Sequence, residues 1–204
     1  MFDFKILFSY IFFTVGKIEC FFYEYLKNPK QIGAFCSSSQ KLGFVMTQNI
    51  NLRQANYIVE IGPGTGVFTE NILKYKNKKA QFFAIEINKN MADKLKRKIV
   101  NLDIEIGSAE NLPYFLRQRN ITYADVIISG IPWSLLRDHE QEKLLKIIHK
   151  SLKPNGYFST FAYALPTYSS LKFRQKIFSL FAEVRISKVV WQNLPPAVVY
   201  YCKK

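Results

Sequence analysis

A chain of 204 residues can form one α/β domain with a hydrophobic core, but it is too short for two domains of ordinary size. Its 29 Lys and Arg residues against 15 Asp and Glu give a net charge of +14, which favours an anionic partner, either nucleic acid or an anionic membrane surface. Cys20, Cys36 and Cys202 are odd in number and form no CxxC pair, so we expect free thiols in a reducing compartment. His139 and His149 are the only histidines and are not at ligand spacing, so no metal site is expected.

Residues 1–27 are crowded with aromatic side chains. Apolar residues fall on one stripe from Phe4 to Leu26 and charged residues on the other side, which predicts an amphipathic helix. Its longest uncharged run, residues 6–16, is shorter than the roughly 20 residues that a membrane-spanning helix requires. The helix either packs on the domain or lies in a membrane interface with its lysines at the headgroups, and we favour the second interpretation. A cleaved signal peptide fits poorly, because Asp3 is acidic and no small-residue cleavage site follows the apolar run.

A connecting segment over residues 27–46 follows this helix. Pro29 ends the first helix, and the capping box in Ser37-Ser38-Ser39-Gln40 predicts the start of another. These serines serve as an N-cap or lie near a ligand, because the segment leads directly into the first strand. We therefore divide the chain into residues 1–46, an N-terminal helix with a segment that covers the ligand, and residues 47–204, the domain.

The stretch over residues 57–70, YIVEIGPGTGVFTE, predicts a ligand site. Its first apolar run is typical of a buried parallel strand, the glycines of residues 62–66 turn the chain sharply, and residues 67–73 continue with helical periodicity. A strand, a glycine turn and a helix N-terminus together offer free backbone N–H groups and a helix dipole. This unit therefore suits an anionic or strongly polar ligand group.

The spacing of this turn separates it from dinucleotide sites. It reads GxGxG rather than GxGxxG, and Glu60 stands just before it, where a pyrophosphate would be repelled and a cation is better suited. Residues 81–87 predict a second buried strand, which places Glu86 about twenty residues after Gly66. At a strand tip beside the turn, this carboxylate accepts two hydrogen bonds from ribose hydroxyls; a solvated loop residue is the alternative.

The third and fourth strands are predicted over residues 104–106 and 124–129. Gly107-Ser108-Ala109-Glu110 follows the third strand, where small residues let a flat adenine approach the backbone and the serine or glutamate fixes its edge. An ordinary βα turn is the alternative. Gly130-Ile131-Pro132-Trp133 follows the fourth strand, and we expect the substrate there, because ligands of an open α/β sheet bind beyond the carboxyl ends of its strands.

The remaining elements follow from the apolar pattern. Helices are predicted over residues 90–100, 140–152 and 171–181, and strands over residues 157–163, 184–191 and 197–202. Pro154-Asn155-Gly156 ends the helix before the fifth strand, and residues 171–181 form a second basic amphipathic segment.

In this order, the motifs VEIGPGTG, AIEIN, GSAENLP and ISGIPW resemble those of class I S-adenosylmethionine-dependent methyltransferases, over about residues 57–202. The resemblance implies an α/β fold: a single Rossmann-like domain with a seven-stranded, mostly parallel sheet and helices on both faces, here with an added N-terminal amphipathic helix. It implies S-adenosylmethionine as the cofactor. The residues that the resemblance assigns to cofactor binding are Glu60, Gly62, Gly64, Thr65, Gly66, Glu86, Ile87, Ser108, Ala109, Glu110 and Ser129.

Two branches of that class are similar to the chain. In rRNA adenine dimethyltransferases the fourth motif reads Asn-(Leu/Pro)-Pro-(Tyr/Phe), and its Asn holds the target amine, but Gly130 stands in that place here. Bacterial phospholipid N-methyltransferases, of the phosphatidylethanolamine and ornithine-lipid type, also resemble the chain at PKQIGAFCSSS, TFAY and NLPPAVVY and in an N-terminal amphipathic helix. We therefore expect a lipid headgroup N-methyltransferase; an rRNA adenine N6-methyltransferase is the alternative.

The implied reaction is the in-line attack of a neutral headgroup amine on the methyl group of a sulfonium. Catalysis then depends on alignment, for which effective molarities reach roughly 10⁵ M or more. Trp133 and Tyr163 are candidate aromatic faces for the methylated cation, with core packing as the alternative, and Gly130 is the third residue expected in the catalytic pocket. Tyr163 is also the preferred proton acceptor, with Tyr200 or solvent as alternatives.

A basic residue must contact the lipid phosphate, and Lys30, Lys172 and Arg174 are candidates. With residues 1–27 on an anionic membrane surface, we expect a cytoplasmic enzyme attached peripherally to the inner membrane. Its expected partners are that surface and the lipid substrate, and not nucleic acid.

Overall fold

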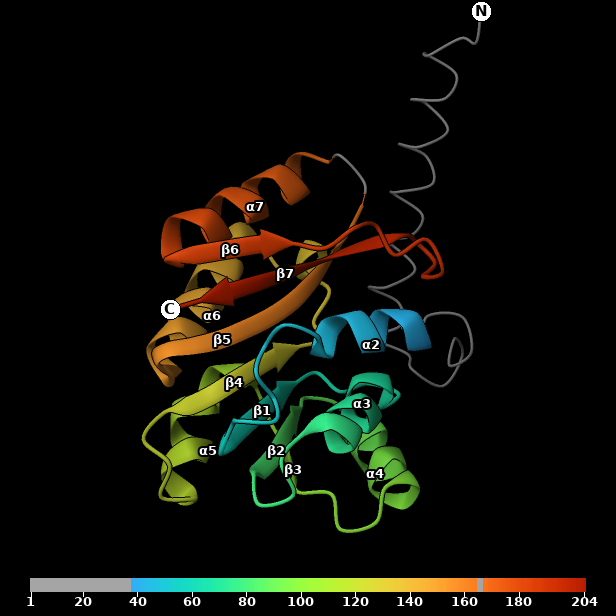
Figure 1. Ribbon diagram of the computed structural model, residues 1–204, viewed down its shortest axis with the longest axis vertical. Coiled ribbons are helices and arrows are strands. Elements are labelled where there is room, and N and C mark those ends of the chain that lie inside the picture. Colours follow the sequence, from blue (N-terminus) through green and yellow to red (C-terminus); the bar gives the residue numbers. More distant parts are fainter. Residues whose placement is uncertain (1–37, 165–166) are drawn as a thin grey trace, which may run out of the picture. The chain divides into compact units, whose positions relative to one another are not determined.

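The computed structural model describes residues 38–164 and 167–204 (Figure 1). The compact unit that contains them runs from Ser37 to Lys204. The first helix described, α2 (Gln40–Thr47), belongs to this unit, and its Met46 is fully buried. The domain therefore begins before the predicted boundary at residue 47.

Three predictions fall on residues outside the described part of the chain. They are the amphipathic helix over residues 1–27, the phosphate contact of Lys30, and the free thiols of Cys20 and Cys36. Cys202 is buried with a free thiol. Within residues 38–164 and 167–204, no helix is long and apolar enough to span a bilayer, and no group of three or more His, Cys, Asp or Glu side chains could hold a metal ion.

Seven strands form one sheet in the order β3-β2-β1-β4-β5-β7-β6. They are β1 (Tyr57–Ile61), β2 (Gln81–Glu86), β3 (Ile104–Ile106), β4 (Ala124–Ser129), β5 (Leu152–Tyr163), β6 (Glu183–Ile186) and β7 (Ala197–Lys203). The neighbouring strands among β1 to β5 pair in parallel, and β7 is antiparallel to both β5 and β6. The predicted mostly parallel sheet is confirmed, and the carboxyl ends of β1 to β5 lie along one edge.

Helices cover both faces of this sheet (Figure 1). The helices after α2 are α3 (Val67–Tyr75), α4 (Lys89–Lys98), α5 (Leu112–Gln118), α6 (Asp138–Ser151) and α7 (Tyr168–Leu180). Successive side chains of a strand point to opposite faces, so Val59 and Ile61 pack in one core with α5, α6 and α7. Ile58 packs on the other face with α2 and α3. Ala84 of β2 packs with α4.

Three elements differ most from the sequence predictions, while α4, α6, α7 and β7 differ by one to three residues at their ends. The strand β5 begins at Leu152 rather than at residue 157, with an irregular register opposite β4. The helix α5 was not predicted, although Pro113 near its start is a typical first-turn residue. The strand β6 ends at Ile186 rather than at residue 191, because the Oγ of Ser187 accepts the backbone N–H of Val199 at 2.9 Å and so replaces a strand carbonyl.

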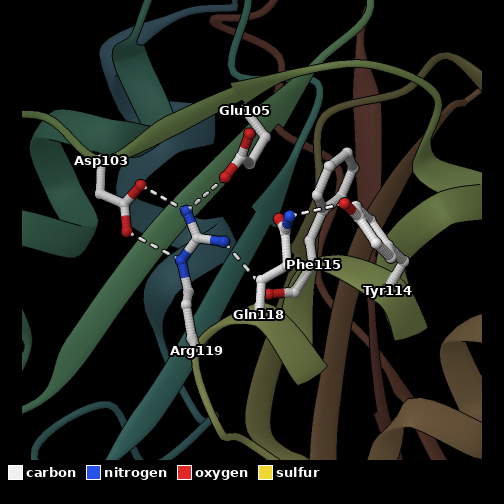
Figure 2. A network of polar contacts seen from close by, with 6 residues as sticks. All are labelled: Asp103, Glu105, Tyr114, Phe115, Gln118 and Arg119. Atoms are coloured by element: carbon white, nitrogen blue, oxygen red, sulfur yellow. Dashed lines mark hydrogen bonds and ion pairs between the residues drawn. The ribbon is translucent and has the colours of Figure 1, made fainter.

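Arg119 connects the end of α5 to the edge strand β3 (Figure 2). Its guanidinium donates to Asp103 at 2.9 and 2.5 Å and to Oε1 of Glu105 at 2.8 Å, and it also donates to the carbonyl of Phe115 at 3.1 Å. The group lies 4.2 Å from the ring centroid of Phe83. Because both carboxylates favour its charged form, the pKa of Arg119 is raised. This contact fixes β3, whose carboxyl end contributes to the site described next.

Candidate cofactor and substrate site

The glycine turn connects β1 to α3 through three residues with left-handed backbone angles. The φ angles of Gly62, Gly64 and Gly66 are 69°, 54° and 90°, values that residues with a side chain rarely adopt. A Cβ at Gly66 would lie 2.4 Å from Cδ1 of Leu95, so glycine also lets α4 pack against the turn. Half-buried Thr65 accepts at its carbonyl from Nζ of Lys98 at 3.2 Å. The first N–H groups of α3, beyond the turn, have no partner within the helix.

Glu86 lies at the tip of β2 beside this turn. Its Oε2 accepts from the backbone N–H of Gly64 at 3.3 Å, and its Oε1 accepts from the N–H of Asn88 at 2.9 Å. The side chain is 7% exposed, and burial raises its pKa. The following residue, Ile87, is 67% exposed. The two residues present a hydrogen-bonding carboxylate and an apolar surface side by side.

Glu60 is fully buried beneath the glycine turn, so the expectation that it faces a ligand directly needs correction. Its Oε2 accepts from the hydroxyl of Thr69 at 2.7 Å, while its Oε1 has no hydrogen-bond partner. Burial, reinforced by the charge of Glu86, raises its pKa to about 8. The carboxyl group is therefore mostly protonated at neutral pH in this structure. An unpaired buried oxygen is costly unless a partner satisfies it.

The residues that follow β3 are engaged with the protein itself. The Oγ of Ser108 accepts from the backbone N–H of Glu110 at 3.2 Å, and the carboxylate of Glu110 pairs with Nζ of Lys143 at 2.6 Å. Of the two residues predicted to contact the edge of an adenine, Ser108 can still donate a hydrogen bond from its hydroxyl. The carboxylate of Glu110 is instead directed to Lys143 on α6. Ala109 is half-buried against the core, and Ile106 before it is 43% exposed.

The carboxyl end of β4 packs tightly against the glycine turn. The N–H of Gly130 donates to the carbonyl of Ile61 at 2.8 Å, and a Cβ at this position would lie 2.4 Å from the carbonyl oxygen of Gly62. Ser129 is fully buried, and its Oγ accepts from the N–H of Ile131 at 3.3 Å. Any side chain at residue 130 would require the backbone to move. Gly130 therefore has a packing role here, and Ser129 presents no free surface to a ligand.

Trp133 lies in the core rather than at a substrate surface, which corrects its predicted placement. It is 2% exposed, stacks on Phe173 with ring centroids 4.9 Å apart, and meets the ring of Phe158 edge-on at 6.4 Å. Its Nε1 donates to Oγ1 of Thr160 at 2.7 Å, and this hydroxyl is 3.2 Å from the carbonyl of Ser129. Trp133 thus fixes the loop after β4 to β5.

Gln141 of α6 holds the same loop from the other side and was not singled out by the sequence. The side chain is 3% exposed, and its Nε2 donates to the carbonyls of Trp133 at 2.8 Å and Leu136 at 3.0 Å. Its Oε1 accepts from Nζ of Lys176 on α7 at 3.1 Å. No sequence motif marks a lone glutamine in a helix, so only the fold identifies this role.

Tyr163 ends β5 at the same edge of the sheet. It is half-buried, and its ring meets that of Phe161 edge-on at 5.7 Å. The alternative proton acceptor, Tyr200, is 5% exposed, packs edge-on against Phe173, and has a pKa raised by burial. Of the two tyrosines, Tyr163 is the more exposed.

Comparison with known proteins identifies the domain. A family model described as a methyltransferase domain matches residues 58–156, from β1 into β5. The chain contains a class I S-adenosylmethionine-dependent methyltransferase domain. The solved O-methyltransferase TomG from Streptomyces achromogenes, in complex with SAM, superposes with a TM-score of 0.64 at 14% identity, covering 82% of each chain, which confirms the fold of the methyltransferase domain.

Two curated relatives differ in how much of the chain they match. The ornithine lipid N-methyltransferase of Singulisphaera acidiphila is 26% identical over 183 residues, which are 88% of this chain and 92% of that protein. The ribosomal RNA small subunit methyltransferase A of Thermotoga petrophila is 25% identical over 111 residues, 54% of this chain and 40% of that protein. Similarity to the first thus extends beyond the methyltransferase domain core.

The residues of the methyltransferase domain fit S-adenosylmethionine, which is its cofactor. The first turn of α3, whose N–H groups have no partner within the helix, suits the carboxylate of its methionine part. Glu86 suits the ribose hydroxyls, whereas Glu60 is fully buried beneath the turn and presents no surface to the cofactor. When bound, the cofactor supplies a methyl group on a positively charged sulfur. The glycine turn, the first turn of α3 and Glu86 are the parts of this chain that would hold it.

Proposed function

We propose that this protein transfers methyl groups from S-adenosylmethionine to the headgroup amine of a membrane lipid, either an ornithine lipid or phosphatidylethanolamine. The observation that carries the proposal is the similarity to the ornithine lipid N-methyltransferase, which spans 88% of this chain and 92% of that relative. A match of that extent includes the segments before and after the cofactor motifs. Those segments are where methyltransferases that share a cofactor site differ in substrate.

Adenine methylation in ribosomal RNA is the second candidate, because the ribosomal RNA methyltransferase A of Thermotoga petrophila is similar to 54% of this chain. The packing at Gly130 opposes it. The Asn that holds the base amine in the enzymes this motif resembles would need its Cβ 2.4 Å from the carbonyl oxygen of Gly62. A pocket without that amide has no matching way to orient an adenine amine, whereas an aliphatic amine requires no planar partner.

The proposed chemistry requires few reactive side chains. The nitrogen of a neutral amine forms a bond to the methyl carbon as the bond from carbon to sulfur breaks, and the nitrogen releases one proton. The main contribution of the protein is alignment of the three atoms. Tyr163 is the proposed acceptor of that proton and the proposed aromatic face for the methylated product, since Trp133 and Tyr200 are buried.

The proposed location is the cytoplasmic face of the inner membrane, with peripheral attachment through residues 1–27. The apolar stripe of that segment and the net charge of +14 support it, because both suit an anionic lipid surface.

Labelled-methyl transfer tests the proposal directly. The full chain is incubated with methyl-labelled cofactor and either a total bacterial lipid extract or purified ribosomal RNA, and the label in each is counted. We expect label in an amine-containing lipid and none in RNA. Label in RNA alone would overturn the lipid assignment and establish the second candidate. A Glu86→Ala variant serves as the control for transfer that depends on the cofactor site.

A further inference from the structure

The helix α7 is apolar on two opposite faces. Its inner face buries Phe173 and Ile177 in the core, at 2% and 0% exposure. Its outer face carries three large apolar side chains in water: Tyr168 is 75% exposed, Leu171 55% and Phe178 47%. A surface helix of a soluble domain normally places polar residues on its outer side. The outer residues of α7 therefore lack the environment that their chemistry favours.

These outer residues lie on one side of the helix, interrupted by one polar residue. Residues three or four positions apart share a helix face, and Tyr168, Leu171 and Phe178 follow this spacing with exposed Gln175 between the last two. We call these three apolar residues the outer stripe of α7. Exposed apolar residues that occur singly are ordinary, but three aligned on one helix mark a contact surface.

Cations flank the outer stripe on both sides. Nζ of Lys172 lies 4.7 Å from the ring centroid of Tyr168, and the guanidinium of Arg174 lies 5.5 Å from that of Phe178. The helix has three basic residues and no acidic one. Lys176, the third, is directed inward to Asp138, so Lys172 and Arg174 carry the charge of the outer side. An apolar stripe with basic residues at its borders has the composition of a helix that lies in the surface of an anionic bilayer.

The position of α7 fits the same partner. The strand β5 ends at Tyr163 and α7 begins at Tyr168, so α7 starts at the edge of the sheet that carries the cofactor site (Figure 1). A bilayer in contact with the outer stripe would thus lie next to the edge where a lipid headgroup must enter.

We propose that the outer stripe of α7 docks on an anionic lipid bilayer, independently of residues 1–27. In choosing a bilayer over other anionic partners, the inference rests on the proposed lipid function. The apolar side chains enter the headgroup region, and Lys172 and Arg174 contact lipid phosphates. The domain then has a membrane contact of its own beside its active edge.

Vesicle sedimentation of the full chain tests this surface. The vesicles contain phosphatidylglycerol and phosphatidylcholine, which have no primary amine, so binding does not require a methyl acceptor. The variant Leu171→Asp/Phe178→Asp is compared with Leu73→Asp/Val100→Asp, which alters two exposed apolar residues on α3 and after α4 and changes the net charge equally. We expect the partition coefficient of the α7 variant onto the vesicles to fall at least about tenfold. That of the control variant should change by less than about threefold.

Several outcomes would overturn the proposal. If both variants lose vesicle binding equally, the binding depends on net charge alone. If the α7 variant binds vesicles as well as the unsubstituted protein, the outer stripe of α7 does not contact the bilayer. Lower thermal stability with unchanged partition would assign the stripe to contact with another segment of this chain. If the α7 variant loses binding to RNA but keeps binding to vesicles, the outer stripe of α7 contacts nucleic acid and not a bilayer.

A parallel assay keeps the two proposals separate. Methyl transfer to lipid dispersed in detergent does not need a bilayer. Retained transfer with lost vesicle binding supports the outer stripe as a docking surface. Absence of transfer to lipid in the unsubstituted protein would contradict the proposed function, while the vesicle comparison would still decide the role of α7.

Discussion

The buried carboxyl group of Glu60 makes the stability of the domain depend on pH. Its pKa is about 8 in the folded protein and 4.5 in an exposed glutamate. Between these values the folded state binds one proton more than the unfolded state, so the free energy of unfolding falls as pH rises. Each pH unit contributes about 1.4 kcal/mol, which gives about 5 kcal/mol in total across this range.

Glu60→Gln isolates this contribution. A glutamine has nearly the same shape, keeps an oxygen that accepts from the hydroxyl of Thr69, and cannot ionise. Near pH 5 the variant and the unsubstituted protein should be similarly stable, because Glu60 is then neutral. Above pH 8 the variant should be the more stable, by up to about 5 kcal/mol.

Urea unfolding without cofactor from pH 5 to pH 9, followed by tryptophan fluorescence, measures the difference. Glu142→Gln is the matched control, because its carboxylate is exposed and pairs with Lys146, which lowers its pKa. The difference in the free energy of unfolding between Glu142→Gln and the unsubstituted protein should stay constant from pH 5 to pH 9. A constant difference for Glu60→Gln as well would refute the reasoning that Glu60 is protonated in the folded domain.

Three further substitutions test other contacts of the site. Glu86→Ala removes the acceptor beside the glycine turn, and calorimetric titration should show at least about tenfold weaker binding of S-adenosylmethionine; unchanged affinity would remove Glu86 from the site. Gly130→Ala places a methyl group against the carbonyl of Gly62 and should lower the free energy of unfolding by about 1–3 kcal/mol in urea, whereas a neutral result would show that this backbone can move. Gln141→Leu leaves two carbonyls of the loop after β4 without their donor. We expect the free energy of unfolding to fall by about 2 kcal/mol and the KM for the methyl acceptor to rise. A change in stability alone would limit Gln141 to a structural role.

The cofactor side of the site could be predicted because its signals are local. A glycine pattern directly after a strand specifies a left-handed turn, and a carboxylate at the end of the next parallel strand must lie beside it. The structure places Glu86 there, with a hydrogen bond from Gly64. The parallel pairing of β1 to β5 follows from the same alternation of strands and helices, whereas the order of the strands was not predicted.

The substrate side could not be predicted with the same accuracy, because side-chain direction depends on tertiary packing. The position of Trp133 after β4 is correct, but its ring turns inward to Phe173, a residue forty positions later on α7. The burial of Glu60 likewise depends on α3 covering its face of the sheet. For α7, the sequence indicates a basic amphipathic helix, and only the structure shows which apolar residues remain outside.

The location of β7 has a consequence for how the domain forms during synthesis. β7 is the last strand of the domain in sequence, yet it lies inside the sheet between β5 and β6. In the described part of the chain, β6 has no strand partner other than β7. Once β6 has left the ribosome, it is therefore an unpaired strand with open hydrogen-bonding groups until residues 197–203 have also emerged. During that interval the nascent domain depends on its five parallel strands for order, and a chaperone that binds extended segments would find its target at residues 183–186.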